Sequence, residues 1–487
     1  MADRMRAVLD IAQKAVEAAR RAGADVADAR VSTDESESIT VRDDAMEGVD
    51  RSVSTGVGIR VLAGGRWGFA ATARLDEGEI AATAELAVRI ARAASRLPGE
   101  PVVLAEVEPA RATWATPIER DPFEVPLDEK VALLLRATGI AASQPGVTYS
   151  EAFLDLFRRT TSFASSDGAA IEQTITNAGA GLAATAVGDD DVQRRSYPDS
   201  FRGHHRAAGW EHVVALDLSG HAERVGREAV ELLDAPVCPS EVTTLVLDAN
   251  QMELQIHESV GHPTELDRVL GMELAFAGGS FVKPDDIGRL RYGSPLVTIV
   301  ADATLPGGLG TFGYDDEGVP AQRTPLIQDG LLVGLLTNRE TAPAIGATSN
   351  GTARADGWMH LPLIRMTNIS IEPREGSLEE ILGDTADGIF MSTNTSWSID
   401  DHRINFQFGC EYARRIEGGK LTQLYKNPNY TGITPEFWGS CDAVGGAGSF
   451  VVYGTPNCGK GQPGQTGRVG HGAAPARFRN VQVGVGG

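Results

Sequence analysis

Two histidines and a glutamate lie close together in the segment Gln255–Pro263, which reads QIHESVGHP. His257 and His262 flank Glu258 in the order HExxxH. In the zinc-helix motif HExxH the histidines are four residues apart, and a rotation of about 400° places both imidazoles on one helix face. Five residues correspond to about 500°, so a regular α-helix would direct the two rings about 140° apart. The segment predicts a metal site only if the helix departs from regular geometry.

The residues beside the second histidine favour such a departure. Gly261 tolerates backbone angles that other residues avoid, and Pro263 cannot continue a regular helical hydrogen-bond ladder. A π-bulge, or a helix that ends at Gly261, would bring His262 back toward His257. We expect one of these two arrangements, because a straight α-helix through His262 would count against the site.

A catalytic zinc ion has three protein ligands and an open position for water, so two histidines leave one ligand to be found. Cys458 is a candidate, because its Gly-rich loop PNCGKGQPG follows an apolar strand and lets a thiolate approach an ion closely. Lys460 in this loop can keep the sulfur deprotonated or bind a substrate carboxylate. Glu258 is the candidate general base that takes a proton from the water. Five residues remain rivals for the third ligand position: His471, His402, His360, Glu265 and Asp267.

The first half of the chain, residues 1–235, predicts an α+β domain with an antiparallel sheet and helices. Apolar residues recur at helical spacing before Gly23, and a second helix is expected from an Asp76 cap to Leu97. Strand-like stretches surround a Gly64-Gly65 turn and recur after a third helix that Asp128 is expected to cap. The expected strands are 29–32, 38–42, 57–62, 67–71, 147–157, 161–165 and 169–187.

The second half, residues 236–487, predicts a β-rich domain, barrel- or sandwich-like, that carries the metal helix. A strand at Val242–Leu247 precedes Asp248, which is expected to cap the helix with HESVGH. After about residue 290, strand-like stretches alternate with Gly-Gly and Asp-Gly turns.

Composition limits the classes of partner. A formal net charge of -22 repels phosphate backbones and anionic membrane surfaces, so neither nucleic acid nor a membrane is an expected partner. Four cysteines without a CxxC pair form no disulfide framework and fit a reducing cytoplasm. The N-terminus has no continuous apolar segment of the secretory kind, and no stretch of about 18 apolar residues predicts a membrane span.

Four motifs together carry a resemblance to a known family. They are HESVGH, YDDEGVPAQRTPLIQDGLLVG, the stretch from Asn350 through HLPLIRMTN, and CGKGQPGQ. On these motifs the chain resembles the TldD/PmbA family of metallopeptidases, in its metal-bearing TldD-like branch, over most of its length. The segment after HESVGH lacks the Arg-rich stretch of better-known TldD proteins, which leaves substrate preference and partner choice open.

The resemblance implies a zinc site made of His257, His262 and Cys458, with Glu258 as the catalytic carboxylate. His360 and Arg365 in HLPLIRMTN match a motif of the family, and the expectation for them is either substrate binding or a structural hydrogen-bonding role. Family members are expected to cleave unfolded or extended peptides, as homodimers or as heterodimers with a PmbA-type subunit.

The leading hypothesis from sequence is therefore a cytoplasmic, zinc-dependent peptidase with a Glu general base and a peptide bound at a strand edge. One alternative is a non-catalytic, zinc-containing partner or regulatory subunit, which a closed four-ligand site would support. The other is an amidase that acts on a small molecule, which a small sealed pocket would support.

Overall fold

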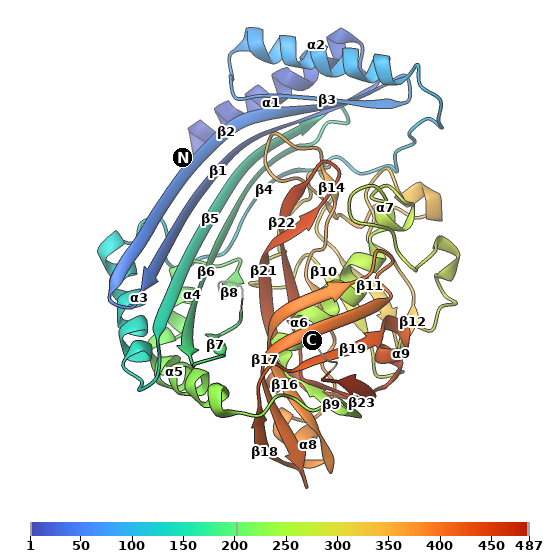
Figure 1. Ribbon diagram of the computed structural model, residues 1–487. Helices are drawn as coiled ribbons and strands as arrows, with labels where there is room; N and C mark the ends of the chain where they lie inside the picture. The colour runs from blue at the N-terminus through green and yellow to red at the C-terminus, as the bar shows by residue number, and fades with distance from the viewer. Residues whose placement is uncertain (1, 201–202, 485–487) are drawn as a thin grey trace.

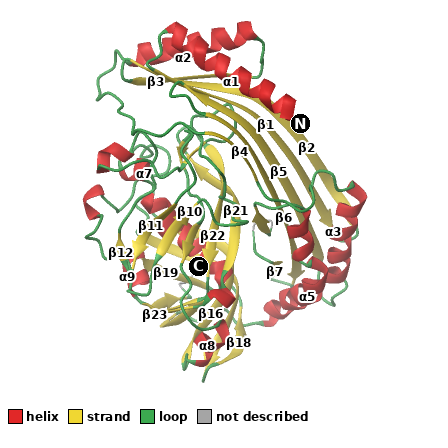
Figure 2. Cartoon of the chain, turned by 180° about the vertical axis from the view of Figure 1, so that it is seen from behind, coloured by secondary structure: helices red, strands yellow, loops and turns green. Residues whose placement is uncertain are grey.

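The computed structural model describes residues 2–200 and 203–484, with side chains from residue 8 onward. It is a mixed α+β structure, as expected, with an antiparallel sheet in the N-terminal half and a β-rich C-terminal half. The long N-terminal sheet curves around the C-terminal half, and its helices lie on the outer side (Figures 1 and 2). The predicted domain division at residues 235 and 236 stays a prediction.

The N-terminal sheet runs in the order β3-β2-β1-β5-β6-β4, with β7 and β8 also paired to β6. Its strands are β1 (Val26–Arg42), β2 (Ala45–Ala63), β3 (Arg66–Thr72), β4 (Arg111–Ala115), β5 (Tyr149–Ser165), β6 (Ala170–Val187), β7 (Val192–Tyr197) and β8 (His204–Arg206). The helices of this half are α1 (Ala2–Ala22), α2 (Glu77–Ala94), α3 (Leu127–Ala142), α4 (Trp210–Ala215) and α5 (Leu218–Asp234).

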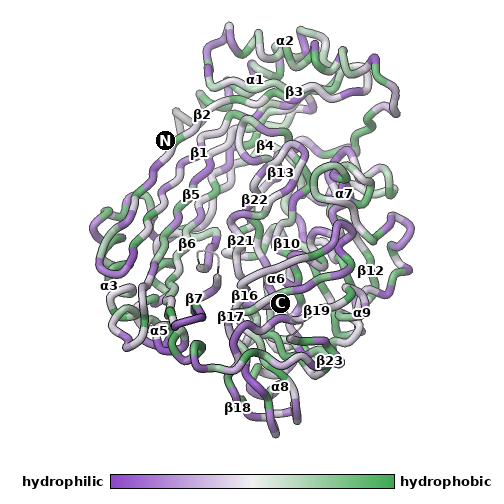
Figure 3. Tube along the Cα trace, in the orientation of Figure 1, coloured by the Kyte–Doolittle hydropathy of each residue, from purple (hydrophilic) through white to green (hydrophobic). Residues whose placement is uncertain are grey.

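The two faces of the sheet differ in chemistry, because side chains alternate between faces along a strand. On β1, Ala29 and Val31 pack with α1 and α2, while Ile39 packs in the cluster under α3 and α5. Figure 3 shows hydrophilic and hydrophobic residues alternating along these strands. The opposite face is polar and meets the C-terminal half through ion pairs, among them Arg30 with Asp316 at 3.4 Å and Arg60 with Glu317 at 2.8 Å. Arg60 also pairs within the sheet with Asp28 at 2.7 Å.

In the C-terminal half, five strands close into a ring in the order β16-β9-β23-β19-β17, because β17 also pairs with β16. The strands of the ring and its two edge additions are β9 (Glu241–Leu247), β16 (Asp387–Ile399), β17 (Asn405–Glu417), β18 (Lys420–Tyr425), β19 (Asn429–Ile433), β20 (Cys441–Val444) and β23 (Ala476–Val483). The barrel-like arrangement expected from sequence is therefore confirmed.

Smaller sheets complete this half. One sheet has the order β12-β11-β10-β15, and two hairpins pair β13 with β14 and β21 with β22. Their strands are β10 (Ile299–Asp302), β11 (Arg323–Gln328), β12 (Leu331–Leu332), β13 (Ala353–Arg354), β14 (Leu363–Ile364), β15 (Ile369–Ile371), β21 (Val451–Lys460) and β22 (Gln465–Ala473). The helices are α6 (Ala249–Ile256), α7 (Leu266–Val269), α8 (Leu378–Gly383) and α9 (Thr434–Gly439).

Helix α6 is anchored inside the largest hydrophobic core. Met252 and Ile256 are fully buried in this core together with residues of the ring. Buried hydrogen bonds add to this packing: Gln251 donates to the Tyr430 hydroxyl at 3.1 Å, and in the turn that follows the helix Ser259 Oγ accepts from Trp438 at 2.9 Å. Burial and these hydrogen bonds fix the position of the helix that leads into the HESVGH segment.

Several predicted boundaries were wrong. The second helix ends at Ala94 rather than Leu97, and α3 has Pro126, without a side-chain cap, where Asp128 was expected. Short predicted strands are parts of long ones, since β1 and β5 each continue through polar stretches that pair across the sheet. No described helix combines the length and the apolar character that crossing a membrane requires.

Candidate metal centre

The HESVGH segment contains a π-bulge, one of the two arrangements expected from its sequence. Regular α-helix ends at Ile256, and residues His257–Gly261 form one π-helical turn. The backbone N–H of His262 donates to the carbonyl of His257, a bond across five residues. The wider turn brings the two imidazoles together with ring centroids 4.9 Å apart and planes 86° to one another.

Gly261 serves this turn through its small size. Its φ of -56° and ψ of -66° are ordinary helical angles. A Cβ at this position would lie 2.2 Å from Met366 Sδ, so only glycine allows the close approach of the segment to Met366. The expectation that Gly261 supplies unusual backbone angles was wrong.

Cys458 lies on strand β21, although sequence placed it in a loop. The pairing of β21 with β22 slips between Thr455, opposite Val469, and Cys458, opposite Gly467. Three steps on β21 match two on β22, which is a β-bulge. A bulge changes which side chains face inward, and Cys458 is 4% exposed at the metal centre.

The sulfur of Cys458 and one nitrogen from each of His257 and His262 lie within 4.8 Å of one another. Each ring also has a defined partner for its other nitrogen. His257 Nδ1 lies 2.8 Å from His471 Nε2, and His262 Nδ1 lies 2.9 Å from a carboxylate oxygen of Glu265. These contacts leave the Nε2 atoms for an ion, so the donor set fits a metal with two imidazoles and one thiolate.

Charge at the centre favours the thiolate. Burial alone would raise the pKa of Cys458, but His257, Arg365 and His262 outweigh it and bring that pKa well below the usual thiol value. Burial lowers the pKa of His257, yet the Cys458 thiolate raises it overall to about 9. Burial keeps the pKa of His262 well below its usual value. Without metal the centre therefore pairs a thiolate with a protonated His257, which must lose its proton when an ion binds.

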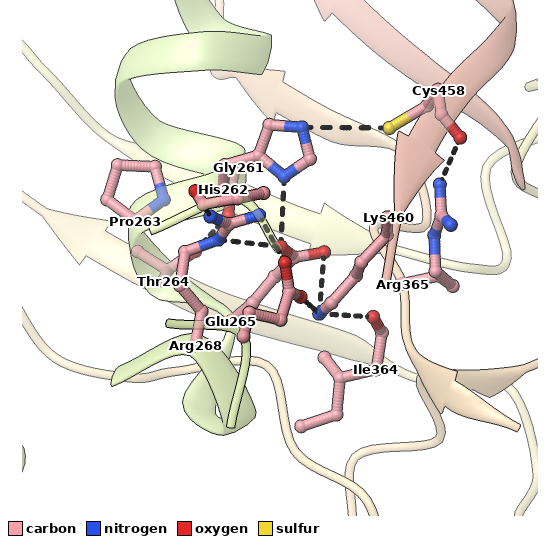
Figure 4. A network of polar contacts seen from close by, with 12 residues as sticks. Gly261, His262, Pro263, Thr264, Glu265, Arg268, Ile364, Arg365, Cys458 and Lys460 are labelled. Carbon is pink, nitrogen blue, oxygen red and sulfur yellow. Dashed lines mark hydrogen bonds and ion pairs between the residues drawn. The ribbon is translucent and has the colours of Figure 1, made fainter. Parts of the chain in front are cut away.

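A buried charge cluster holds Glu265 in place (Figure 4). Lys460 Nζ is fully buried and contacts carboxylate oxygens of Asp267 at 2.8 Å, Glu273 at 3.1 Å and Glu265 at 3.3 Å. Arg268 contacts Glu265 at 3.5 Å and Glu273 at 2.9 Å. The cluster supplies fixed cations to the carboxylate that orients His262.

The three donors open on a cavity of about 270 Å³ lined from both halves of the chain. Glu258 lines this cavity, and Arg403 Nη1 donates to its Oε2 at 2.7 Å. The Nε of Arg403 has no hydrogen-bond partner among the described residues. Arg403 lies between β16 and β17, and no pattern in the sequence indicated that it reaches the cavity.

Two acids from different halves also line the cavity. Asp199 follows β7, whereas Glu253 lies on α6 one turn before His257 and accepts from Thr455 at 2.6 Å. Burial, followed by the charge of Glu253 and a hydrogen bond to it, raises the pKa of Asp199 well above its usual value. The protonated form of Asp199 is therefore favoured beside Glu253, in an arrangement that depends on long-range packing and has no local sequence signal.

The other predicted residues lie apart from the cavity lining. His402 is exposed on the turn between β16 and β17. His360 Nδ1 bonds the carbonyl of Asp356, and Lys460 is enclosed by the acids of the charge cluster. Arg365 is 2% exposed and donates a hydrogen bond to the backbone carbonyl of Cys458, as Figure 4 shows. His471 and Glu265, expected only as rival ligands, instead contact the two histidines.

Comparison with known proteins defines the class of protein. The chain matches the PmbA/TldA metallopeptidase C-terminal domain over residues 240–485, domain 1 over 27–91 and the central domain over 120–235. A metalloprotease of Methanocaldococcus jannaschii is 31% identical over 86% of this chain and 89% of its own length. A zinc metalloprotease TldD homolog of Saccharolobus solfataricus is 22% identical over the same shares, 86% and 89%.

Solved structures share the fold. A protein of Thermotoga maritima described as a candidate modulator of DNA gyrase superposes with a TM-score of 0.75 and 16% identity, over 98% of this chain and 99% of its own. TldE from Thermococcus kodakarensis superposes with a TM-score of 0.71 and 17% sequence identity, over 98% of this chain and 100% of its own. The fold, the donor set and these relatives define a metallopeptidase. The chain belongs to the PmbA/TldD metallopeptidase family.

Proposed function

We propose that this chain is a zinc-dependent peptidase that hydrolyses unfolded or extended peptides, with His257, His262 and Cys458 as ligands. One observation carries the proposal: one nitrogen from each of His257 and His262 and the sulfur of Cys458 converge within 4.8 Å at a cavity that Glu258 also lines. Three protein donors leave a position open, as in catalytic zinc sites, whereas structural sites use four. The donor set therefore favours catalysis over the alternative of a non-catalytic zinc-containing subunit.

The choice of zinc rests on the ligands and on a relative. Imidazole and thiolate together suit zinc better than the harder ions magnesium, calcium or manganese. The Saccharolobus solfataricus relative carries zinc in its printed name. When bound, the ion supplies a Lewis acid that polarises the carbonyl of the scissile bond.

Glu258 is the proposed general base. Arg403 donates to its carboxylate at 2.7 Å and fixes its position at the cavity, where a carboxylate can accept a proton from water. A carboxylate that has accepted this proton can pass it to the leaving amine. Arg403 places a positive charge beside the developing negative charge on the carbonyl oxygen, where fixed donors lower the barrier most.

An extended peptide fits the strand that carries Cys458. Residues 454–459 of β21 line the cavity, and among the described strands β21 pairs with β22 alone. A peptide can add to the other edge of such a strand, a mode that reads backbone more than sequence and excludes folded chains. The volume of about 270 Å³ also suits a small molecule, which keeps the amidase as the second candidate.

Partner and location remain part of the proposal. We infer a dimer, either of two copies or with a PmbA-type subunit, because a solved structure named TldE shares the fold. A cytoplasmic location and the exclusion of nucleic acid rest on composition alone.

The test offers the zinc-loaded chain, alone and mixed with a PmbA-type subunit, three substrates: an unfolded polypeptide, the same polypeptide folded, and small amides. We expect cleavage of the unfolded polypeptide only, lost by at least about 100-fold in Glu258→Gln. Glu436→Gln, an exposed glutamate on α9, removes the same charge and should leave the rate unchanged. Full activity of Glu258→Gln would remove the proposed base, and turnover of small amides alone would favour the second candidate.

A further inference from the structure

Four arginines line a second, smaller cavity between the sheet and the C-terminal half. This cavity has a volume of about 50 Å³, and Arg159, Arg354, Arg365 and Arg468 are among its lining residues. Phe157 and Gln173, from the long strands β5 and β6, line it from the other side. It shares no lining residue with the metal cavity, although the two are connected through Arg365 and Cys458.

Three of the guanidinium groups have no carboxylate partner. Arg159 pairs with Asp34 at 2.6 Å, but Arg354, Arg365 and Arg468 form no ion pair among the described residues. The guanidinium of Arg468 donates no hydrogen bond to any described residue and lies over the Phe157 ring, 3.3 Å from its centroid. The Nε of Arg365, a residue only 2% exposed, has no hydrogen-bond partner in the described structure.

The acids at this cavity do not balance the arginines. Burial, followed by the charge of Glu317, raises the pKa of Asp315 well above its usual value. The Asp315 oxygens accept from the backbone N–H groups of Glu317, Val319 and Ala353 and from no described arginine of the cavity. Asp316 lies 3.4 Å from Arg30, and Asp356 lies 3.9 Å from Arg159. Both remaining carboxylates are thus next to other arginines, and the three guanidinium groups keep a surplus of positive charge.

Burial and the surplus of positive charge lower the pKa values of two of the arginines. Burial, with repulsion from Arg365, lowers the pKa of Arg354 to about 10. Burial, with repulsion from Arg159, does the same for Arg468, also to about 10. A buried charge without a partner destabilises a fold unless a counter-ion compensates it.

We propose that this cavity binds a small tetrahedral oxyanion of the size and charge of sulfate or phosphate. A cavity of about 50 Å³ has room for roughly three or four water-sized groups, which suits such an ion. A planar guanidinium fork binds an oxyanion through paired hydrogen bonds, and the Arg468 group, which donates to no described residue, is free to do so. The Nη groups of Arg354 and Arg365 donate to backbone carbonyls, so these two residues add positive charge and the unpaired Nε of Arg365. The anion would connect the N-terminal sheet to the strands that carry Cys458.

The test titrates the full zinc-loaded chain with sodium sulfate at low millimolar concentration, with sodium chloride at equal ionic strength as the reference. Sulfate is a weak zinc ligand, so binding at the metal centre contributes little. We expect calorimetry to give saturable binding of one sulfate per chain and a rise of about 2–4 °C in the unfolding midpoint. The general stabilising effect of sulfate does not saturate and is common to all variants.

Two variants assign the binding to the cavity. Arg468→Gln should weaken sulfate binding at least tenfold and remove the saturable rise. Arg289→Gln, which removes the same charge from an exposed site, should behave like the parent. Equal responses in all three proteins, or an equal response to chloride, would overturn the proposal.

A crystal soaked with selenate keeps the proposal testable if Arg468→Gln does not fold. A selenium anomalous peak among Arg354, Arg365 and Arg468 supports the site. No saturable sulfate binding to the parent chain, or a selenium peak only elsewhere, refutes it.

Discussion

The Nδ1 atom of His257 lies 2.8 Å from Nε2 of His471, and His471 Nδ1 faces the carbonyl of Ile369 at 3.3 Å. A carbonyl only accepts, so His471 is protonated on Nδ1 and accepts through Nε2. His257 must then carry a proton on Nδ1, so Nε2, on the side of Cys458, is the nitrogen that loses its proton when an ion binds. Burial, with the charge of His257, holds the pKa of His471 well below its usual value and keeps this acceptor neutral.

The first prediction concerns this contact. His471→Ala removes the acceptor that fixes the tautomer and orientation of His257, so zinc affinity should fall by about 10–100-fold. Competition with a chromogenic chelator measures the affinity. His402→Ala, at an exposed histidine, is the matched control and should leave it unchanged. A larger loss in His402→Ala than in His471→Ala would make His402 the better candidate ligand.

The second prediction separates Arg403 from metal binding. Arg403→Gln removes the donor to Glu258 and the positive charge at the cavity, and kcat on an unfolded polypeptide should fall by about 100–1,000-fold. Zinc content by elemental analysis should stay at that of the parent, because Arg403 contacts none of the three donors. Arg289→Gln controls for the loss of one positive charge. Unchanged kcat would show that Arg403 only balances the charge of Glu258.

The sequence predicted the metal-bearing helix better than its surroundings. The geometry of HESVGH is set by neighbouring residues, because two imidazoles five residues apart can meet only where the regular α-helix is interrupted. Cys458 was predicted to lie in a loop because glycine-rich sequence such as Gly459 and Gly461 is typical of loops. The segment is a strand because it pairs with β22. Local patterns carry no information on that partner.

Residues brought together by long-range packing were missed. Asp199 and Glu253 meet although one follows β7 and the other lies on α6. Arg403 contacts Glu258 from a turn in which Arg403 itself has a positive φ of 63°. Such angles favour glycine, so nothing in the sequence indicated this turn. Lys460 was expected to keep the Cys458 sulfur deprotonated or to bind a substrate carboxylate. Its ion pairs with Glu265, Asp267 and Glu273 could not be predicted, because these acids lie far from it in the sequence.

The third prediction concerns pH and Glu273 in the charge cluster. Burial raises the pKa of Glu273 from 4.5 to about 7. The charge of Lys460 lowers this pKa and the charge of Glu265 raises it, but burial has the largest effect. The folded chain therefore holds a proton that the unfolded chain has lost above pH 4.5. This stabilisation is complete at low pH and is lost as the pH rises through about 7, so the free energy of unfolding should fall by up to about 3 kcal/mol.

Denaturant unfolding of the metal-free chain between pH 5 and pH 8 measures this slope. Glu273→Gln mimics the protonated side chain and should flatten it, whereas Glu436→Gln should keep the slope of the parent. Because buried histidines with lowered pKa values add stability over the same range, the test is the difference between the two proteins: a parent chain that gains stability relative to Glu273→Gln as the pH rises would contradict the sign of the shift.

The fourth prediction tests why the π-helical turn needs glycine at position 261. In Gly261→Ala the new Cβ would lie 2.2 Å from Met366 Sδ, so the segment or Met366 must move. We expect a loss of about 1–3 kcal/mol in stability and weaker zinc binding, because His262 follows directly. The double variant Gly261→Ala/Met366→Ala removes the clash but leaves a cavity, and it should recover zinc affinity while remaining less stable than the parent. If position 261 mattered through its backbone angles, Met366→Ala would restore nothing, and zinc affinity of the double variant would equal that of Gly261→Ala alone.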